Sequence, residues 1–151
     1  MSPQDRSHEP IVITGVGLVT SLGQDRESVW QSIQAGRSNV RPLEGLPGIP
    51  DGQMFGATVD IAEQAPGQLK VIPLCQRAAR EAIKDSAIDL NSVDQTRFGS
   101  AIAGHMADTR WLGNDLAQAG PGSANWWDQF FPSTAGTLLA HEFGLLGPRL
   151  C

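Results

Sequence analysis

The sequence is poor in cysteine, has no cluster of positive charge and lacks a long apolar run. Its 151 residues include only two cysteines, Cys75 and Cys151, far apart and without metal-ligand spacing. A disulfide framework and a metal site are therefore not expected, and a reducing cytoplasm is the predicted compartment. Lys and Arg number 11 against 16 Asp and Glu, and they form no basic stripe, so nucleic acid is not an expected partner.

The absence of long apolar stretches also bears on membranes and export. No run approaches membrane-spanning length, and the polar start, MSPQDRSHEP, lacks the apolar core of a signal peptide. Residues 1–9 are expected to form a flexible tail. The rest, 10–151, has the size of one domain, and a hydrophobic content of 40% is typical of a chain that forms a core.

Strand-like and helix-like segments alternate along this domain. Runs of apolar residues that contain or adjoin glycine predict three strands, the middle one weaker: 10–19, 54–60 and 97–104. Helical spacing, capping residues and glycine stops predict three helices: 26–36, 73–88 and 133–144. The stretch 37–53 is expected to be loop. This order predicts an α/β layered domain with a parallel or mixed sheet.

The stretch TGVGLVTSLG raises the possibility of a dinucleotide site. The fingerprint needs a third glycine where this sequence has Thr20, and the next helix is predicted to begin only after Asp25. Such a helix starts too late to hold a pyrophosphate next to Gly15 and Gly17. Close backbone packing explains these glycines better, so a nucleotide-binding module is the weaker alternative and no cofactor is expected.

Three histidines and one aromatic cluster are the remaining site candidates apart from the cysteines. The histidines are His8, His105 and His141, and the cluster consists of Trp126, Trp127, Phe130 and Phe131. His105 follows a predicted strand end, where sites of α/β proteins gather, whereas His141 lies within a predicted helix and fits a solvated or packing role. The aromatic cluster fits a greasy pocket, a dimer contact or plain core anchoring of a long loop.

The two cysteines differ in their surroundings. Cys75 lies on or near the apolar face of a predicted helix, which favours a buried and inert thiol. Cys151 follows a glycine-proline turn, as a presented nucleophile would. No helix follows it to lower its thiol pKa, and only Arg149 supplies a cation close in sequence, so a catalytic role is the weaker interpretation.

The order of these segments resembles one known family. The motifs IVITGVGLVTSLG, VWQSIQAGRSNVRPL, LCQRAAREAIKDSAIDL, RFGSAIAG and FFPSTAGTLLAHEFGLLGP are together similar to the N-terminal half of β-ketoacyl-acyl carrier protein synthases. The resemblance runs from about Pro10 to Pro148. It implies a thiolase-like fold of two α/β halves with the active site between them, of which this chain carries the first, a mixed sheet flanked by helices.

The resemblance also implies a reaction and its partners. Members condense an acyl thioester with a malonyl thioester on acyl carrier protein, without cofactor or metal, and they are homodimers. Their nucleophilic cysteine lies farther beyond the GP turn than Cys151, in a T-A-C-x-S-like segment, and their catalytic histidines and lysine lie in the second half. No catalytic residue is therefore carried over, Cys151 is expected to be a packed residue of the preceding strand, and 10–151 is expected to stop before the nucleophile segment.

The sequence departs from the family pattern at a few places. QLKVIPL stands where a Met-Asp-Arg-like run is usual, which puts the basic surface for carrier protein in doubt. In addition, GHMADTRW replaces a glycine-rich turn, and Ser133 replaces an asparagine.

The chain alone is expected to be inactive and to expose an apolar face, through which it self-associates or binds a partner half. The alternative is a non-catalytic partner or scaffold subunit of a condensing complex.

Overall fold

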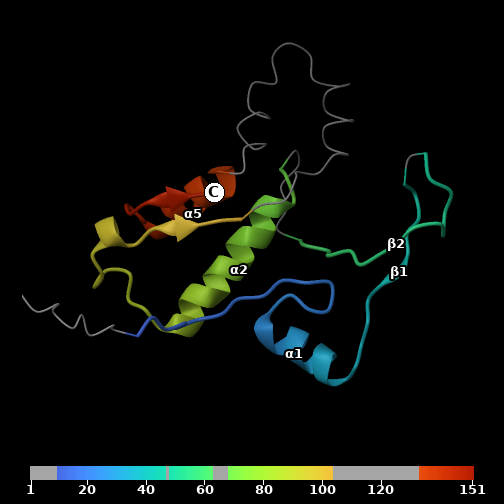
Figure 1. Cartoon of the computed structure of the whole chain (residues 1–151), viewed down its shortest axis with the longest axis horizontal. Coiled ribbons are helices and arrows are strands. Elements are labelled where there is room, and N and C mark those ends of the chain that lie inside the picture. The colour runs from blue at the N-terminus through green and yellow to red at the C-terminus, as the bar shows by residue number, and fades with distance from the viewer. Residues whose placement is uncertain (1–9, 47, 63–67, 104–132) are drawn as a thin grey trace, which may run out of the picture.

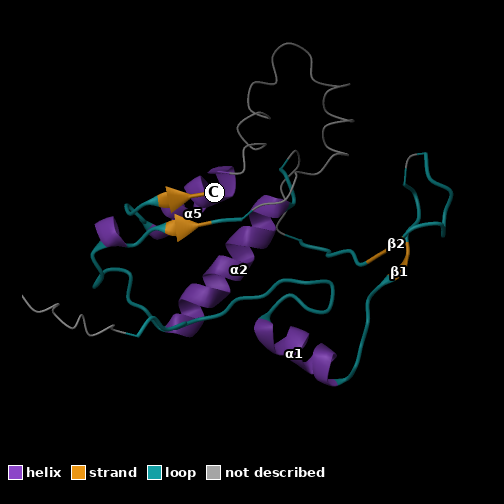
Figure 2. Ribbon diagram, in the orientation of Figure 1, coloured by secondary structure: helices purple, strands orange, loops and turns teal. Residues whose placement is uncertain are grey.

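A computed structural model of the chain describes residues 10–46, 48–62, 68–103 and 133–151. The described elements are short strands and longer helices (Figure 2). In chain order they are α1 (Arg26–Gln34), β1 (Arg41–Pro42), β2 (Phe55–Gly56), α2 (Val71–Ser86), the 3-10 helix η1 (Gln95–Arg97), β3 (Ser100–Ala101), α5 (Ser133–Phe143) and β4 (Arg149–Leu150). None of the described helices is long and apolar enough to cross a membrane.

Helix α2 is the central element of the described fold (Figure 1). Helix α5 and the strands β3 and β4 lie on one side of it, and α5 contacts α2 and both of these strands. The N-terminal segment and α1 lie on the other side, and the β1–β2 hairpin lies at a distance from α2 (Figure 1). Elements thus flank α2 on two sides, as a layered α/β arrangement requires.

The described strands form two small sheets. β3 pairs in parallel with β4, with Ser100 opposite Arg149 and Ala101 opposite Leu150. β1 pairs antiparallel with β2. The prediction of a strand within 97–104 is thus confirmed in its centre. The stretch 37–53 was expected to be loop, but it contains the short strand β1, which pairs with β2 across an intervening turn.

The helices predicted at 26–36 and 73–88 are confirmed. Helix α1 begins after Asp25, whose carboxylate accepts the Ser28 N–H at 2.8 Å. This hydrogen bond lowers the pKa of Asp25. The helix ends before Gly36, where φ is +63°. Helix α2 begins two residues earlier than predicted and keeps Pro73 in its first turn, where a missing N–H has little cost.

The third predicted helix is also confirmed, as α5, and it ends before Gly144, where φ is +68°. Helix α5 and the start of α2 supply most of the buried apolar side chains. The buried hydrophobic residues are Val29, Leu69, Ile72, Ala135, Leu139, Ala140 and Leu145.

The segment 10–19 differs from its prediction. It was expected to be a buried strand, but it forms no strand pairing with the described residues. Its side chains Ile11, Val12 and Ile13 are 102%, 67% and 87% exposed. A strand that is apolar on both faces needs neighbouring strands as well as covering layers, and the described part of the chain provides no neighbouring strand here.

Several predictions concern residues outside the described part. The flexible tail 1–9 with His8, the strand end at His105, and the aromatic residues of the segment 121–131 all lie there.

Candidate functional site

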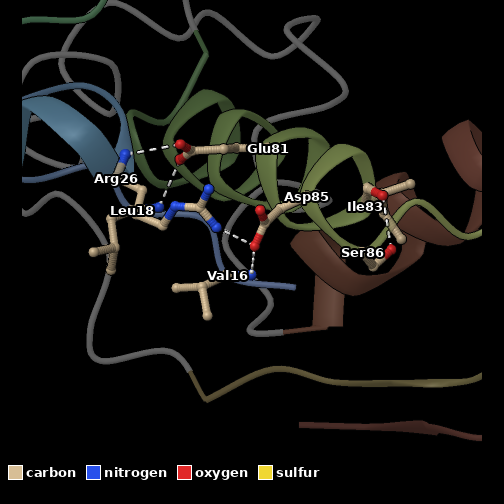
Figure 3. Close-up of polar contacts among 7 residues, drawn as sticks. All are labelled: Val16, Leu18, Arg26, Glu81, Ile83, Asp85 and Ser86. Atoms are coloured by element: carbon tan, nitrogen blue, oxygen red, sulfur yellow. Dashed lines mark hydrogen bonds and ion pairs between the residues drawn. The ribbon is translucent and has the colours of Figure 1, made fainter. Parts of the chain in front are cut away.

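Two carboxylates of α2 hold the N-terminal segment on this helix (Figure 3). Glu81 accepts the backbone N–H groups of Leu18 at 2.9 Å and Arg26 at 2.7 Å. Asp85 accepts the N–H of Val16 at 3.0 Å and forms an ion pair with the Arg26 guanidinium. We call Glu81 and Asp85 the carboxylate clamp. Because an unpaired segment lacks ladder hydrogen bonds, these side chains supply acceptors that a neighbouring strand would otherwise provide.

Two glycines allow the approach that the clamp needs. A Cβ added at Gly15 would lie 2.2 Å from the backbone oxygen of Ala82, and one added at Gly17 would lie 1.9 Å from that of Ala78. Any side chain would collide with α2 at both positions. The structural interpretation of these glycines, close packing after an extended segment, is confirmed.

The charges around Asp85 favour its ionised form. The side chain of Arg26 and, next, the Val16 N–H hold the pKa of Asp85 below its ordinary value of 3.8. The same interaction raises the pKa of Arg26. Asp85 is therefore a carboxylate at neutral pH, and its contacts strengthen the fold only in that form.

Replacing Asp85 by asparagine is expected to weaken the fold mainly at neutral pH. A carboxylate whose folded pKa is depressed contributes stability above its unfolded pKa, and this is lost as pH falls through the folded value. The melting temperatures of the wild type and Asp85→Asn should differ most near pH 7 and converge below the ordinary value of 3.8. An unchanged difference across calorimetric scans over this range would contradict the assignment.

A cavity of about 550 Å³ lies between α5 and the strands β3 and β4. Its lining combines a thiol, an imidazole, a guanidinium and several hydroxyls. The lining residues are Ser100, Ser133, Gly136, Thr137, His141, Arg149, Leu150 and Cys151. Helix α5 supplies one wall and the two paired strands supply the other.

The cavity brings together candidates that the sequence left apart. Cys151 was expected to be packed in a core strand, but it lies just beyond β4 and is exposed. β4 is only two residues long and, among the described strands, pairs with β3 alone. His141 and Arg149 line the same cavity as this thiol. Within the described residues, Cys151 forms no hydrogen bond or ion pair, so no base is engaged with its sulfur.

The other cysteine lies apart from this cavity. Cys75 is half-buried on α2, and burial raises the pKa of its thiol. A raised pKa favours the protonated thiol over the thiolate, which is the nucleophile. Among the described residues no group of three or more His, Cys, Asp or Glu side chains is placed to hold a metal ion.

Comparisons with known proteins point to one family. Residues 8–72 match the model described as Beta-ketoacyl synthase, N-terminal domain. The chain is 26% identical to the tetracenomycin polyketide synthase ketoacyl synthase alpha subunit of Streptomyces glaucescens, across 91% of this chain and 37% of that protein. It is also 26% identical to the 3-oxoacyl-[acyl-carrier-protein] synthase 2 of Coxiella burnetii, across 93% of this chain and 37% of the relative.

Solved structures support the same fold. The chain aligns with a crystal structure of a β-ketoacyl synthase from Burkholderia phymatum with a TM-score of 0.69 and 23% identity, covering 92% of this chain and 38% of the other. A chain from a solved complex of a type II polyketide acyl carrier protein with its ketosynthase also aligns with this chain. Its TM-score is 0.60 at 17% identity, and the alignment covers 91% of this chain and 40% of the other. The fold is therefore thiolase-like, and the chain spans little more than a third of the length of its relatives.

Proposed function

We propose that the chain belongs to the β-ketoacyl synthase family and forms the N-terminal half of a condensing enzyme of fatty acid or polyketide synthesis, because residues 8–72 match the N-terminal domain of that family. The proposal rests on the shared fold, which extends over 92% of the chain. The chain reaches β4, which by the family resemblance is the strand that leads toward the nucleophile. Residues 10–151 would thus form the acyl-pocket side of this half and end before the nucleophile segment.

The complete enzyme would act in two stages. A cysteine thiolate first attacks an acyl thioester, so that the acyl group moves to the enzyme and the carrier thiol leaves. Loss of CO₂ from a malonyl thioester then gives a carbanion equivalent, which attacks the enzyme-bound acyl carbonyl and displaces the cysteine sulfur. Backbone N–H groups stabilise the oxyanion formed in each stage. The described residues do not supply this machinery, so the chain alone would be inactive.

Partners are proposed on the same basis. Acyl carrier protein would deliver both substrates, as expected for a relative of a ketosynthase whose structure includes its carrier protein. The exposed side chains of Ile11, Val12 and Ile13 would be covered by the remainder of a ketosynthase, or by a second copy when the chain is alone. Two free thiols are consistent with a reducing cytoplasm.

A chimera tests the proposed function. Residues 10–148 would replace the matching part of the Coxiella burnetii synthase, and the relative's own sequence is kept from the residue after that part onward, including the strand that leads toward the nucleophile. We expect the chimera to take up an acyl group on the relative's cysteine and to condense it with malonyl-acyl carrier protein, whereas the unmodified chain takes up no acyl group on either thiol by intact-mass measurement.

Two outcomes of this experiment would contradict the proposal. One is a chimera that melts cooperatively yet neither takes up acyl groups nor condenses them. The other is an acyl adduct on Cys151 of the unmodified chain, which would make this exposed thiol the nucleophile.

The second candidate function is a non-catalytic partner subunit of a condensing complex. It is favoured by the surroundings of the two cysteines, because one thiol has a raised pKa and the other has no hydrogen bond within the described residues. A partner subunit would bind a complete ketosynthase with a defined stoichiometry, measurable by light scattering of the mixture. A chimera active in condensation would exclude this candidate.

A further inference from the structure

The cavity between α5 and the β3–β4 pair has a polar lining that the proposed condensing function does not use. Three hydroxyl groups line it, those of Ser100, Ser133 and Thr137, together with the Arg149 guanidinium and the His141 ring. The chain as a whole has a net charge of -5, yet the described residues that line this cavity include no Asp or Glu side chain. The local excess of donors and positive charge suits an anion.

One of these hydroxyls is buried and unsatisfied. The Oγ of Ser100 has no hydrogen-bond partner in the part of the chain that the structure describes. A buried hydroxyl without a partner is unfavourable, and most such groups in folded proteins are paired. Ser100 precedes Ala101 in β3 and lines the cavity, so an acceptor atom bound there would satisfy its O–H.

The geometry of α5 adds donors to the same cavity. Its first turn, with Ser133 and Gly136, contributes to the wall, and helix N-terminal N–H groups carry partial positive charge. Thr137 and His141 follow at one-turn intervals from Ser133, which puts the three on one helix face. A Cβ added at Gly136 would lie 3.7 Å from the Ser100 Oγ, an ordinary contact distance. The glycine therefore places no side chain against this buried hydroxyl.

We propose that this cavity binds a phosphate group, either as the free ion or as the monoester of a small molecule. Arg149 would pair with two phosphate oxygens, while Ser100 and the first turn of α5 would donate hydrogen bonds to the others. The volume of about 550 Å³ leaves room for an organic group beyond the phosphate, next to Leu150. This inference does not depend on the proposed condensing function.

Isothermal titration of the whole chain with inorganic phosphate and with propyl phosphate tests the proposal, with chloride at matched ionic strength as the background. We expect saturable binding that weakens about tenfold or more in Arg149→Gln, since a charge-assisted bidentate pair is lost. The matched control Arg37→Gln removes one exposed cation outside the cavity and should leave binding unchanged. Tighter binding of propyl phosphate would identify a monoester site, and equal binding a site for the free ion.

The variant Gly136→Ala gives a second, independent readout. Its methyl group would cover the Ser100 hydroxyl at an ordinary contact distance and would suit a helix interior, so the fold should persist while phosphate affinity falls. Circular dichroism and melting curves confirm folding of each variant. Failure of either phosphate compound to bind, or binding that is insensitive to both Arg149→Gln and Gly136→Ala, would overturn the proposal.

Discussion

Replacing Gly17 by alanine is expected to lower the free energy of unfolding by about 3 kcal/mol or more, through overpacking against a rigid element. The added Cβ would lie 1.9 Å from the backbone oxygen of Ala78 and 2.8 Å from the backbone nitrogen of Ala82. These are backbone atoms inside α2, so no side-chain rotation relieves the collision. Urea unfolding followed by circular dichroism measures the loss.

A matched glycine separates this collision from a general effect of alanine. Gly136 lies inside α5, and a Cβ there would meet its nearest atom at 3.5 Å. Gly136→Ala should keep the wild-type stability or raise it by up to about 1 kcal/mol, because alanine favours helix. If Gly17→Ala unfolded at the same urea concentration as Gly136→Ala, the packing of the N-terminal segment on α2 would be wrong.

The second large effect concerns association. Changing both Ile11 and Ile13 to aspartate is expected to abolish most self-association of the chain, because their side chains are 102% and 87% exposed and lie on an unpaired segment. Charged side chains on such an edge oppose further strand pairing and apolar contact. Exposed positions away from the core change stability little, so the free energy of unfolding should stay within about 0.5 kcal/mol of the wild type. Sedimentation velocity measures the association.

The β1–β2 hairpin provides the matched control for this variant. Ile49 and Met54 are 37% and 44% exposed, and changing both to aspartate adds the same charge at another place in the chain. We expect this control to associate like the wild type. An equal reduction in both double variants would show that net charge, and not the segment at 11–13, governs association.

The helices could be predicted from the sequence because their determinants are local. Asp25 marks the start of α1, alanines at helical spacing mark α2, and a glycine marks the end of α5. The hydrogen bonds of a helix join residues only four apart in sequence, so such local signals are enough to predict it. The strand expected over 10–19 could not be judged in this way, since a strand depends on neighbours far away in sequence. β1 was missed for the same reason, because its partner strand follows an intervening turn.

The site was predicted in part. The spacing after Gly17 excluded a dinucleotide fingerprint and favoured close packing, which the contact with α2 confirms. The carboxylate clamp was missed, because Glu81 and Asp85 are four residues apart on a helix and this spacing is typical of a solvated face. Only tertiary structure reveals that the backbone N–H groups of residues 16, 18 and 26 donate to these carboxylates.

The cavity was also beyond sequence reasoning. His141 lies in a helix and Cys151 follows a strand, and the turn between these elements brings them to one cavity. The signal that could have suggested it is the helix face of Ser133, Thr137 and His141, whose polar side chains recur at one-turn spacing within an apolar helix. Sequence alone does not say which strand such a face meets.

We propose that this chain is part of a β-ketoacyl synthase and that the rest of such an enzyme covers the exposed apolar side chains of residues 11–13. Light scattering of the wild-type chain over a range of concentrations tests it most directly. We expect a mass that rises with concentration above the 16.1 kDa of the monomer. A mass of 16.1 kDa at every concentration would contradict it.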